Sequence, residues 1–530
     1  MIGTRGRPRS EEARRAILDT ALRLCAQAGY QQLTIKAIAD EAGVGRQTVY
    51  RWWSHKADIL IDAMLDLRER KLSMLYQETG DTLRDVETVL KLTFKLNREL
   101  TGPALVGVSV HYDVGFRSEP EGRTGFAHLF EHLMFQGSES LEKLAHFRHV
   151  QSSGGTFNGS THPDYTDYFE IVPSAALERA LFIEADRMRA PRLTTDNLRN
   201  QIDVVKEEIR LNVLNRPYGG FPWITLPPVL YDTFPNAHNG YGDFSELEAA
   251  TVDDCAAFFD VYYAPGNAVL TVSGDFTVDA ALELVHRHFG DVPARPVPLR
   301  PSFAEPPPEA ERRHRHPDPH APLPALAIGY RMPDPAAGFE DYLAYEVLAA
   351  VLSDGDSSRL EQRLVHTDAL VTDVGAGCGL FGSPLDARDP DTFTITAVHP
   401  ASVDVDQVLA ATDEEIAKLA AEGPDPEELA RITARWAATL FREHDRLVSR
   451  TMAIGTFELL YGRAELIAEL PALVAGMSAE QVANAAGRLR PDSRAVLIVE
   501  PAESMLETAS GSSGSMLETA GGSSGSGEGA

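Results

Sequence analysis

Residues 125–135 read GFAHLFEHLMF, a run of good helix formers that predicts one short helix. His128 and His132 are four positions apart, so their imidazoles project from one helical face and can reach a single zinc ion. Glu131 lies beside them, where a carboxylate can take a proton from zinc-bound water and return it to a leaving amine. The stretch predicts a hydrolytic zinc site, and the alternative is a helix face with surface histidines.

Two imidazoles are too few for the usual catalytic zinc, which has three protein ligands and a water. Residues 204–210 read VVKEEIR and predict a second helix with two adjacent carboxylates, Glu207 and Glu208. Adjacent helical residues point to different faces, so only one of the two can join the histidines. The residues alone leave that choice open.

A helical region precedes a region with strand periodicity. Residues 11–28, 35–42 and 46–52 predict three helices in a helix-turn-helix arrangement. From residue 106 to 114, apolar side chains alternate with polar or small ones, which predicts a half-buried strand. A domain boundary is therefore expected near residues 101–103.

The strand-containing part divides into two similar halves, because residues 292–324 are dense in proline and charge and predict an extended linker. Thr251 caps a predicted helix that leads into a strand, and Ser478 does the same about 226 residues later, which indicates duplication of one α/β unit. We predict a multidomain protein: an all-α helix-turn-helix domain (1–100), a zinc-binding α/β domain (103–291), the linker (292–324), a second, homologous α/β domain (325–501) and a disordered Gly/Ser-rich tail (502–530).

Charge is unevenly distributed over the 530 residues. The net charge of -29 argues against nucleic acid or an anionic membrane as the partner of most of the surface, whereas residues 1–60 carry ten basic and six acidic side chains. The three cysteines lie far apart, which supports neither a disulfide framework nor a cysteine zinc site. The sequence has neither a signal-peptide pattern nor a long apolar run, so we expect a cytoplasmic protein without a membrane partner.

Five segments resemble the insulinase, pitrilysin and mitochondrial processing peptidase family. They are residues 126–138 (FAHLFEHLMFQGS), 154–161 (GGTFNGST), 204–210 (VVKEEIR), 215–219 (NRPYG) and 263–276 (YAPGNAVLTVSGDF). The resemblance covers roughly residues 106–501. It implies processing-peptidase-like α/β domains that form a chamber, one Zn²⁺ per chain and zinc-dependent hydrolysis of extended peptides.

The resemblance also implies roles for particular residues. Glu208 matches the family's distal zinc ligand, so Glu207 becomes its neighbour, and Gln201 stands where the family often has a second glutamate and can act as a hydrogen-bond partner of the site. Residues 154–161 match the family's edge strand that captures a peptide by β-augmentation. The expected peptide contacts there are Gly155, Thr156 and Asn158, although an ordinary glycine-bearing edge strand is the alternative.

The second half departs from the family. The family's substrate-orienting Arg and Tyr positions align with His366 and Thr372. In bacterial relatives of this family, one subunit often carries the zinc and a second subunit carries the Arg and Tyr that orient the substrate. We therefore expect such a heterodimer, with a homodimer of relaxed specificity as the alternative. His314, His316 and His320 in the predicted linker are interpreted as solvated.

Residues 33–39 (LTIKAIA) and 45–53 (GRQTVYRWW) resemble the TetR family of repressors. Such a module would contact DNA, and the alternative is a three-helix interaction module. TetR-like repressors continue into a large helical domain that is clipped here, so we infer a fusion of two modules. The residues implied in DNA contact are Arg46, Gln47, Thr48, Tyr50, Arg51 and Trp52, with Lys56 at the phosphate backbone.

Three functions follow from these patterns. The first is a zinc metalloendopeptidase with an appended DNA-binding domain. The second is a TetR-like transcriptional regulator whose α/β part serves dimerisation or sensing. The third is an inactive chamber subunit, which the complete ligand set makes the weakest hypothesis.

Overall fold

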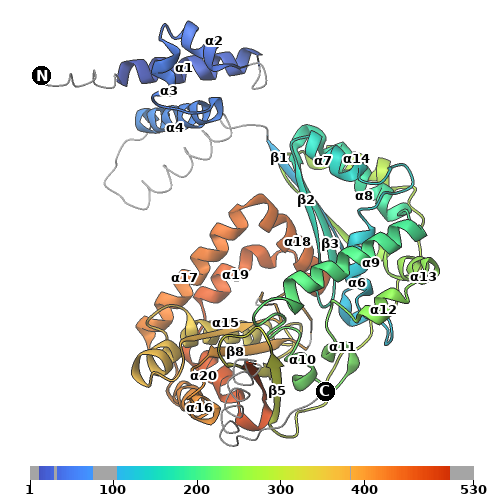
Figure 1. The fold of residues 1–530 in the computed structure, drawn as a ribbon, viewed down its shortest axis with the longest axis vertical. Helices are drawn as coiled ribbons and strands as arrows, with labels where there is room; N and C mark the ends of the chain where they lie inside the picture. Colours follow the sequence, from blue (N-terminus) through green and yellow to red (C-terminus); the bar gives the residue numbers. More distant parts are fainter. Residues whose placement is uncertain (1–10, 29–32, 76–103, 382, 389, 502–530) are drawn as a thin grey trace, which may run out of the picture. The chain divides into compact units, whose positions relative to one another are not determined.

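The computed structural model describes residues 11–28, 33–75, 104–381, 383–388 and 390–501 (Figure 1). The chain divides into two compact units, residues 1–104 and 105–530. The predicted tail at 502–530 and the predicted boundary at 101–103 fall outside the described residues. Within the described residues no single helix has the length and hydropathy of a membrane span, although the bent pair of helices at 466–475 and 479–488 meets that test together.

The N-terminal unit is helical, as predicted. Its helices are α1 (Glu11–Ala28), α2 (Ile35–Glu41), α3 (Arg46–Tyr50) and α4 (Lys56–Leu75). Thr34 caps α2, because its hydroxyl accepts a hydrogen bond from the amide of Ala37 at 3.1 Å. Ile17, Ile38, Val49 and Ile59 bring one side chain from each helix into a common core.

The larger unit contains two lobes, each built on one sheet. In the first lobe the sheet order is β2-β3-β1-β4, and neighbouring strands are antiparallel. Its strands are β1 (Leu105–Tyr112), β2 (Thr156–Thr161), β3 (Thr166–Pro173) and β4 (Ala268–Gly274). Its helices are α6 (Phe126–Leu133), α7 (Ala145–Ser152), α8 (Leu177–Arg189), α9 (Thr195–Ile209), α11 (Phe234–Ala237), α12 (Phe244–Glu248), α13 (Val252–Tyr262) and α14 (Val278–Phe289). The short helix α10 (Pro227–Leu230) lies between α9 and α11 in the chain but packs on the sheet of the second lobe.

The second lobe has a five-stranded sheet in the order β5-β9-β6-β8-β7. Without β5 this is the order of the first sheet, which agrees with the predicted duplication, and the capping boxes expected at Thr251 and Ser478 are both formed. Its strands are β5 (Arg312–Asp318), β6 (Ala325–Arg331), β7 (Asp373–Cys378), β8 (Thr392–Val398) and β9 (Ala495–Pro501). Its helices are α15 (Phe339–Ser353), α16 (Val405–Glu422), α17 (Pro426–Asp445), α18 (Leu447–Tyr461), α19 (Leu466–Ala475) and α20 (Ala479–Arg488).

The linker prediction is wrong for its C-terminal part. Residues 312–318 form β5, which pairs in parallel with β9 at the edge of the second sheet. The pattern of charge and proline concealed this strand, because an edge strand keeps one row of backbone groups and many side chains in solvent. His314 and His316 therefore lie on a strand, and His314 is exposed as expected.

The half-buried strand predicted after residue 106 is buried on both faces. Val106, Val108 and Val110 pack toward the helices of the first lobe, as their spacing of two requires. The opposite face carries Gly107, Ser109 and His111, and α18 of the second lobe covers it instead of solvent (Figure 1). The alternation predicted the strand correctly but its half-burial was wrong, because the small and polar residues line a contact between lobes.

That contact is close. A Cβ atom on Gly107 would lie 2.2 Å from the Thr451 hydroxyl, and one on Gly455 would lie 2.4 Å from the His111 ring. Ser273 and Thr451 share a 2.5 Å hydrogen bond across the same contact. The two lobes therefore share a packed interface and behave as a single unit rather than as two independent domains.

Candidate functional site

Helix α6 carries His128, Glu131 and His132, and a buried carboxylate fixes where it begins. Glu119 accepts hydrogen bonds from the backbone amides of Gly125 and Ala127, at 2.8 and 2.7 Å, and so satisfies donors that have no partner within the helix. Gly125 has φ of 83°, and a Cβ there would lie 2.5 Å from the carbonyl oxygen of Tyr241. Glycine is required at this entry to the helix.

Helix α9 brings Glu208 to the same place. The Nε2 atom of His128 lies 3.7 Å from Oε1 of Glu208, and Nε2 of His132 lies 3.4 Å from Oε2. One ligand atom from each of the three side chains lies within 4.8 Å of the others, and this is the only such group of three among the described residues. Bonds of 2.0–2.2 Å around a tetrahedral zinc separate its ligand atoms by about 3.4 Å, so the three side chains fit that ion.

The protonation states also suit a metal. Burial and the neighbouring His132 lower the pKa of His128 to about 4, although Glu208 opposes this, so the imidazole is neutral at pH 7. The hydrogen bond from His132 lowers the pKa of Glu208 despite partial burial. A neutral imidazole and an ionised carboxylate are the forms that bind a divalent cation.

Glu131 is held beside this cluster by a residue that the prediction did not single out. The Thr161 hydroxyl donates to Oε2 of Glu131 at 2.8 Å. Burial raises the pKa of Glu131, while the Thr161 hydrogen bond and His132 act in the opposite direction. A carboxyl group whose pKa is raised in this way is suited to accept and return a proton near neutral pH.

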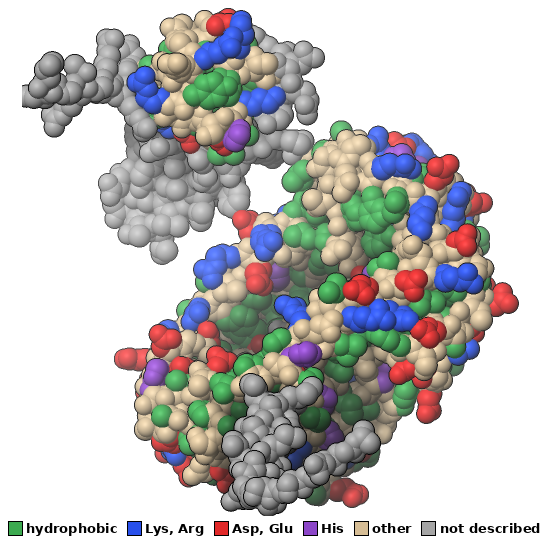
Figure 2. Space-filling view, viewed as in Figure 1, with side chains coloured by type: hydrophobic (Ala, Val, Ile, Leu, Met, Phe, Trp, Pro, Cys, Tyr) green, Lys and Arg blue, Asp and Glu red, His purple; other side chains and the backbone are tan. Residues whose placement is uncertain are grey.

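A cavity of about 290 Å³ opens next to the cluster. Its wall includes aromatic side chains from both lobes: Trp223 lies 5.7 Å from Phe381 of the second lobe, and Phe116 lies 6.0 Å from it, measured between ring centroids. Sequence reasoning missed these residues because they lie in connecting segments without periodicity. The larger unit is hollowed between its lobes, and hydrophobic side chains gather there (Figure 2). The lining residues are Phe116, His128, Glu131, Gly159, Ser160, Thr161, Glu208, Trp223, Gly240, Tyr241 and Phe381.

The predicted peptide strand is an edge strand. β2 occupies one end of its sheet, and Asn158 is exposed on it. Thr156 begins the strand and Gly155 directly precedes it; neither of them nor Asn158 lines the cavity, whereas Gly159, Ser160 and Thr161 do. The side chains nearest Glu131 are therefore shifted by several residues from the predicted ones.

The structure separates the remaining predicted neighbours of the site. Gln201 is buried on α9, two turns before Glu208. Glu207 is exposed and pairs with Arg210 at 3.2 Å, so it faces away from the cluster, as adjacent positions on a helix require. His366 is exposed, the Thr372 hydroxyl donates to the Val398 carbonyl at 3.1 Å, and neither lines the cavity.

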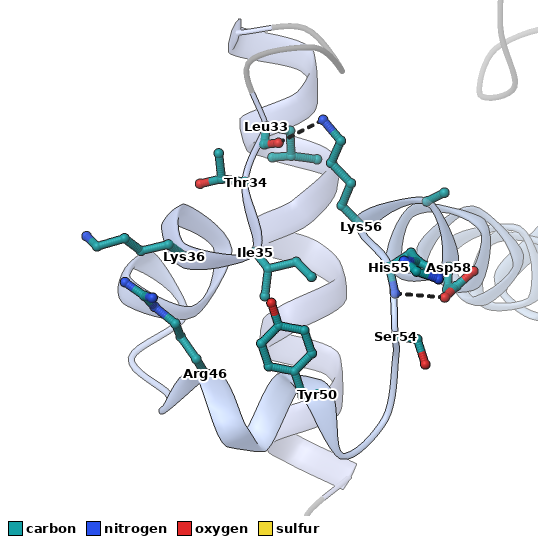
Figure 3. A pocket seen from close by; sticks show the side chains of 11 residues that line it. Leu33, Thr34, Ile35, Lys36, Arg46, Tyr50, Ser54, His55, Lys56 and Asp58 are labelled. Atoms are coloured by element: carbon teal, nitrogen blue, oxygen red, sulfur yellow. Dashed lines mark hydrogen bonds between the residues drawn. The ribbon is translucent and has the colours of Figure 1, made fainter.

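The N-terminal unit exposes the predicted recognition helix. On α3, Arg46, Gln47 and Tyr50 are exposed while Val49 is buried, so the helix presents one face to solvent and one to the core. Lys36, Arg46 and Tyr50 lie around one concave surface (Figure 3). The surface combines basic and aromatic groups, as a nucleic-acid contact requires.

Three predicted DNA contacts, Thr48, Trp52 and Lys56, are only half-exposed. Trp52 lies beyond the end of α3, packs against the core and stacks on Trp53 with centroids 5.8 Å apart, so it is half-buried. The Lys56 ammonium donates to the Leu33 carbonyl at 3.0 Å (Figure 3). Thr48 is half-buried, whereas Arg51 is exposed just after the helix. Helix α3 ends at Tyr50 and is therefore shorter than the predicted helix of residues 46–52.

Comparison with known proteins agrees with both modules. Residues 98–216 match the model of the insulinase family (peptidase family M16), residues 249–435 match the peptidase M16 inactive domain, and residues 17–63 match the bacterial regulatory proteins of the tetR family. A relative named zinc protease PqqE, from Helicobacter pylori, is 29% identical over 55% of this chain and 64% of its own length. The chain therefore spans just under two thirds of that relative.

A crystal structure of a protease from Helicobacter pylori superimposes with a TM-score of 0.69 at 23% identity, covering 75% of this chain and 94% of that one. An HTH-type transcriptional regulator of Bacillus subtilis, YdeS, is 36% identical over 17% of this chain and 43% of its own length. The two M16 models together span more than half of the chain, which belongs to the insulinase (M16) family of peptidases in its two α/β lobes, while its N-terminal unit is similar to the bacterial regulatory proteins of the tetR family.

Proposed function

We propose that the larger unit is a zinc metalloendopeptidase that hydrolyses extended peptides and binds one zinc ion per chain. The observation that carries the proposal is the convergence of His128, His132 and Glu208 on one point, with Glu131 beside it. When bound, zinc supplies a Lewis acid that polarises a peptide carbonyl and acidifies a water molecule.

The protein's own residues transfer the proton, align the peptide and exclude water. Oε2 of Glu131 is held by Thr161, which leaves the other carboxylate oxygen to take a proton from the attacking water and return it to the leaving amine. The exposed edge of β2 aligns the peptide by backbone hydrogen bonds, and the aromatic wall around Phe381 excludes water.

Zinc analysis and a quenched-peptide assay test this proposal together. The purified chain should contain one zinc and cleave the peptide, whereas Glu131→Gln should keep the zinc and lose cleavage by roughly 10²–10⁴-fold, the usual contribution of a general base. Absence of zinc from the active wild-type protein, or full activity of the variant, would contradict the proposal.

We further propose that a homologous subunit bearing Arg and Tyr orients the substrate, because neither His366 nor Thr372 lines the cavity. Adding such a subunit should raise the cleavage rate per zinc. A rate that is unchanged by the partner at every ratio would leave the homodimer as the working form.

We also propose that the N-terminal unit binds operator DNA in the cytoplasm. The exposed Arg46 and Tyr50 on α3, together with the tetR-family match, favour this second function. Retardation of a promoter fragment should weaken steeply with salt, because phosphate contacts release counterions, and should be lost in Tyr50→Ala. Retention of equal affinity by Tyr50→Ala would refute the assignment of this face.

A further inference from the structure

A partly buried polar cluster outside the candidate metal centre joins the two lobes. His162 lies between β2 and β3, and its Nδ1 atom is 2.6 Å from Oδ2 of Asp386 in the second lobe. The hydroxyl of Tyr165 donates to the other Asp386 oxygen at 2.5 Å. The rings of His162 and Tyr165 stack with centroids 4.2 Å apart and an interplanar angle of 7°.

The opposite side of the same imidazole reaches the cavity wall. Nε2 of His162 lies 3.0 Å from the Ser160 hydroxyl and 3.5 Å from Oδ1 of Asp167. Ser160 donates to Asp167 at 2.6 Å, and the next residue, Thr161, donates to Glu131. His162 therefore connects the second lobe to the two hydroxyl residues of β2 that line the cavity.

Ser160, His162 and Asp386 are arranged in the order of a serine nucleophile, its base and an orienting acid. The electrostatics exclude that role. Burial alone would lower the pKa of His162, but Asp386 and Asp167 outweigh it and raise the pKa to about 10. A protonated imidazole donates from both nitrogens and cannot accept the proton of Ser160, which is already directed at Asp167.

We propose that His162 is a positioning residue that ties the second lobe to β2, so that Thr161 holds Glu131 in place only while the lobes are joined. The proposal rests on the peptidase function proposed above. It assigns the contact between lobes a role in catalysis as well as in stability.

The titratable groups that face His162 determine how its contact with the second lobe depends on pH. They are Asp167 from β3, Asp386 from the second lobe, Tyr165 from the turn and His111 from β1. Burial lowers the pKa of His111 to about 4, so it is neutral above that pH. The pKa of His162 is higher in the folded than in the unfolded state, so its stabilisation is complete below the unfolded value of 6.5, declines as pH rises and is lost at about 10.

A double-mutant cycle tests the proposal with His162→Asn, Asp386→Asn and the combined variant. His149→Asn, an exposed histidine on α7, is the matched control. For each protein we would measure zinc content, kcat and KM per folded, zinc-loaded molecule, and the urea midpoint at pH 7 and pH 10.

Each single variant should keep its zinc and lose kcat on the order of 10²-fold, the scale expected when a catalytic group is misplaced by about 1 Å. The combined variant should lose no more than either single one, because the two residues act as a unit. The wild-type midpoint should fall more between pH 7 and pH 10 than that of His162→Asn.

A purely structural role would lower the urea midpoint and leave kcat per folded molecule unchanged, and this result would overturn the proposal, as would additive losses. If the wild type bound no zinc and cleaved no peptide, the peptidase proposal itself would fail. If the wild type were inactive but the changes in urea midpoint of the single and combined variants were not additive, His162 would only join the lobes. That result would overturn its positioning role.

Discussion

The two lobes of the larger unit share a scaffold and differ in chemistry. Both sheets place their four common strands in one order, and both lobes form a capping box before the last of those strands. Helix α6 of the first lobe carries His128, Glu131 and His132, whereas α15 of the second lobe has no histidine at all. The two lobes share strand order and helix capping, while the candidate metal centre is formed by side chains of the first lobe.

A cavity between α15, β7 and α17 of the second lobe differs in chemistry from the cavity beside Glu131. It is lined by Ala349, Ile432, Trp436 and Thr439, together with Cys378 and the buried carboxyl group of Glu346. Burial raises the pKa of Glu346 to about 7, so that carboxyl group is partly neutral at physiological pH, although Cys378 opposes the shift. Among its described residues, the second lobe has this cavity but no group of three side chains that could hold a metal ion.

Removing the first lobe's distal ligand should have the largest effect. Glu208→Gln replaces an ionised ligand with a neutral amide, so zinc affinity should fall by more than the roughly 10–100-fold lost on mutating a partner of a ligand, and cleavage should be lost with it. Competition with a chelator measures the affinity. Retention of tight zinc binding would show that the metal has another set of ligands.

Overpacking the contact between lobes should cost the next largest amount. In Gly455→Val the new side chain meets the His111 ring, which a Cβ would approach to 2.4 Å, so we expect a loss of about 3 kcal/mol in the free energy of unfolding. Gly487→Ala in α20, where a Cβ would meet its nearest neighbour at 3.9 Å, is the control and should be neutral or slightly stabilising. Urea denaturation compares them, and equal stability of the two variants would contradict a shared interface.

Neutralising Glu346, whose Oε1 atom is buried in the second lobe, should have a smaller, pH-dependent effect. The pKa of Glu346 is higher in the folded than in the unfolded state, so the wild-type protein loses stability as pH rises from about 4.5 to about 7. Glu346→Gln should remove that loss and be more stable than the wild type at pH 8 by about 2–3 kcal/mol, with a smaller difference at pH 4.5. A difference that is independent of pH would contradict the raised pKa.

The smallest effect is expected at the residue next to Glu208. Glu207→Gln should change neither zinc affinity nor cleavage by more than about twofold, because its carboxylate faces Arg210 at the surface and exposed ion pairs contribute little. It is the matched control for Glu208→Gln in the chelator and peptide assays. A large effect would mean that the two adjacent carboxylates are not separated as the helix requires.

Local spacing made the convergence of the three candidate zinc ligands predictable. Histidines four apart on a helix share a face in any fold, and the choice of Glu208 over Glu207 followed from the resemblance to the insulinase family. The alternation in β1 was also correct, but alternation does not say whether Gly107 and Ser109 face solvent or α18, a helix that lies far along the chain. Such long-range contacts leave no periodic signal.

The same limit explains the residues that were missed. Phe381 and Asp386 reach the first lobe from a connecting segment of the second, and their neighbours there, Trp223 and His162, are just as distant in sequence. The strand β5 was concealed by its one proline and its three arginines, because an edge strand tolerates both residue types. Residues that complete a site across two lobes need the fold to identify them.

Zinc K-edge X-ray absorption of the purified protein, combined with metal content, tests the central claim most directly. We expect one zinc per chain in a shell of nitrogen and oxygen donors, two of them imidazoles, and disappearance of that shell in Glu208→Gln loaded with one equivalent of zinc. A sulfur shell near about 2.3 Å, or a stoichiometry far below one in the active protein, would contradict the account.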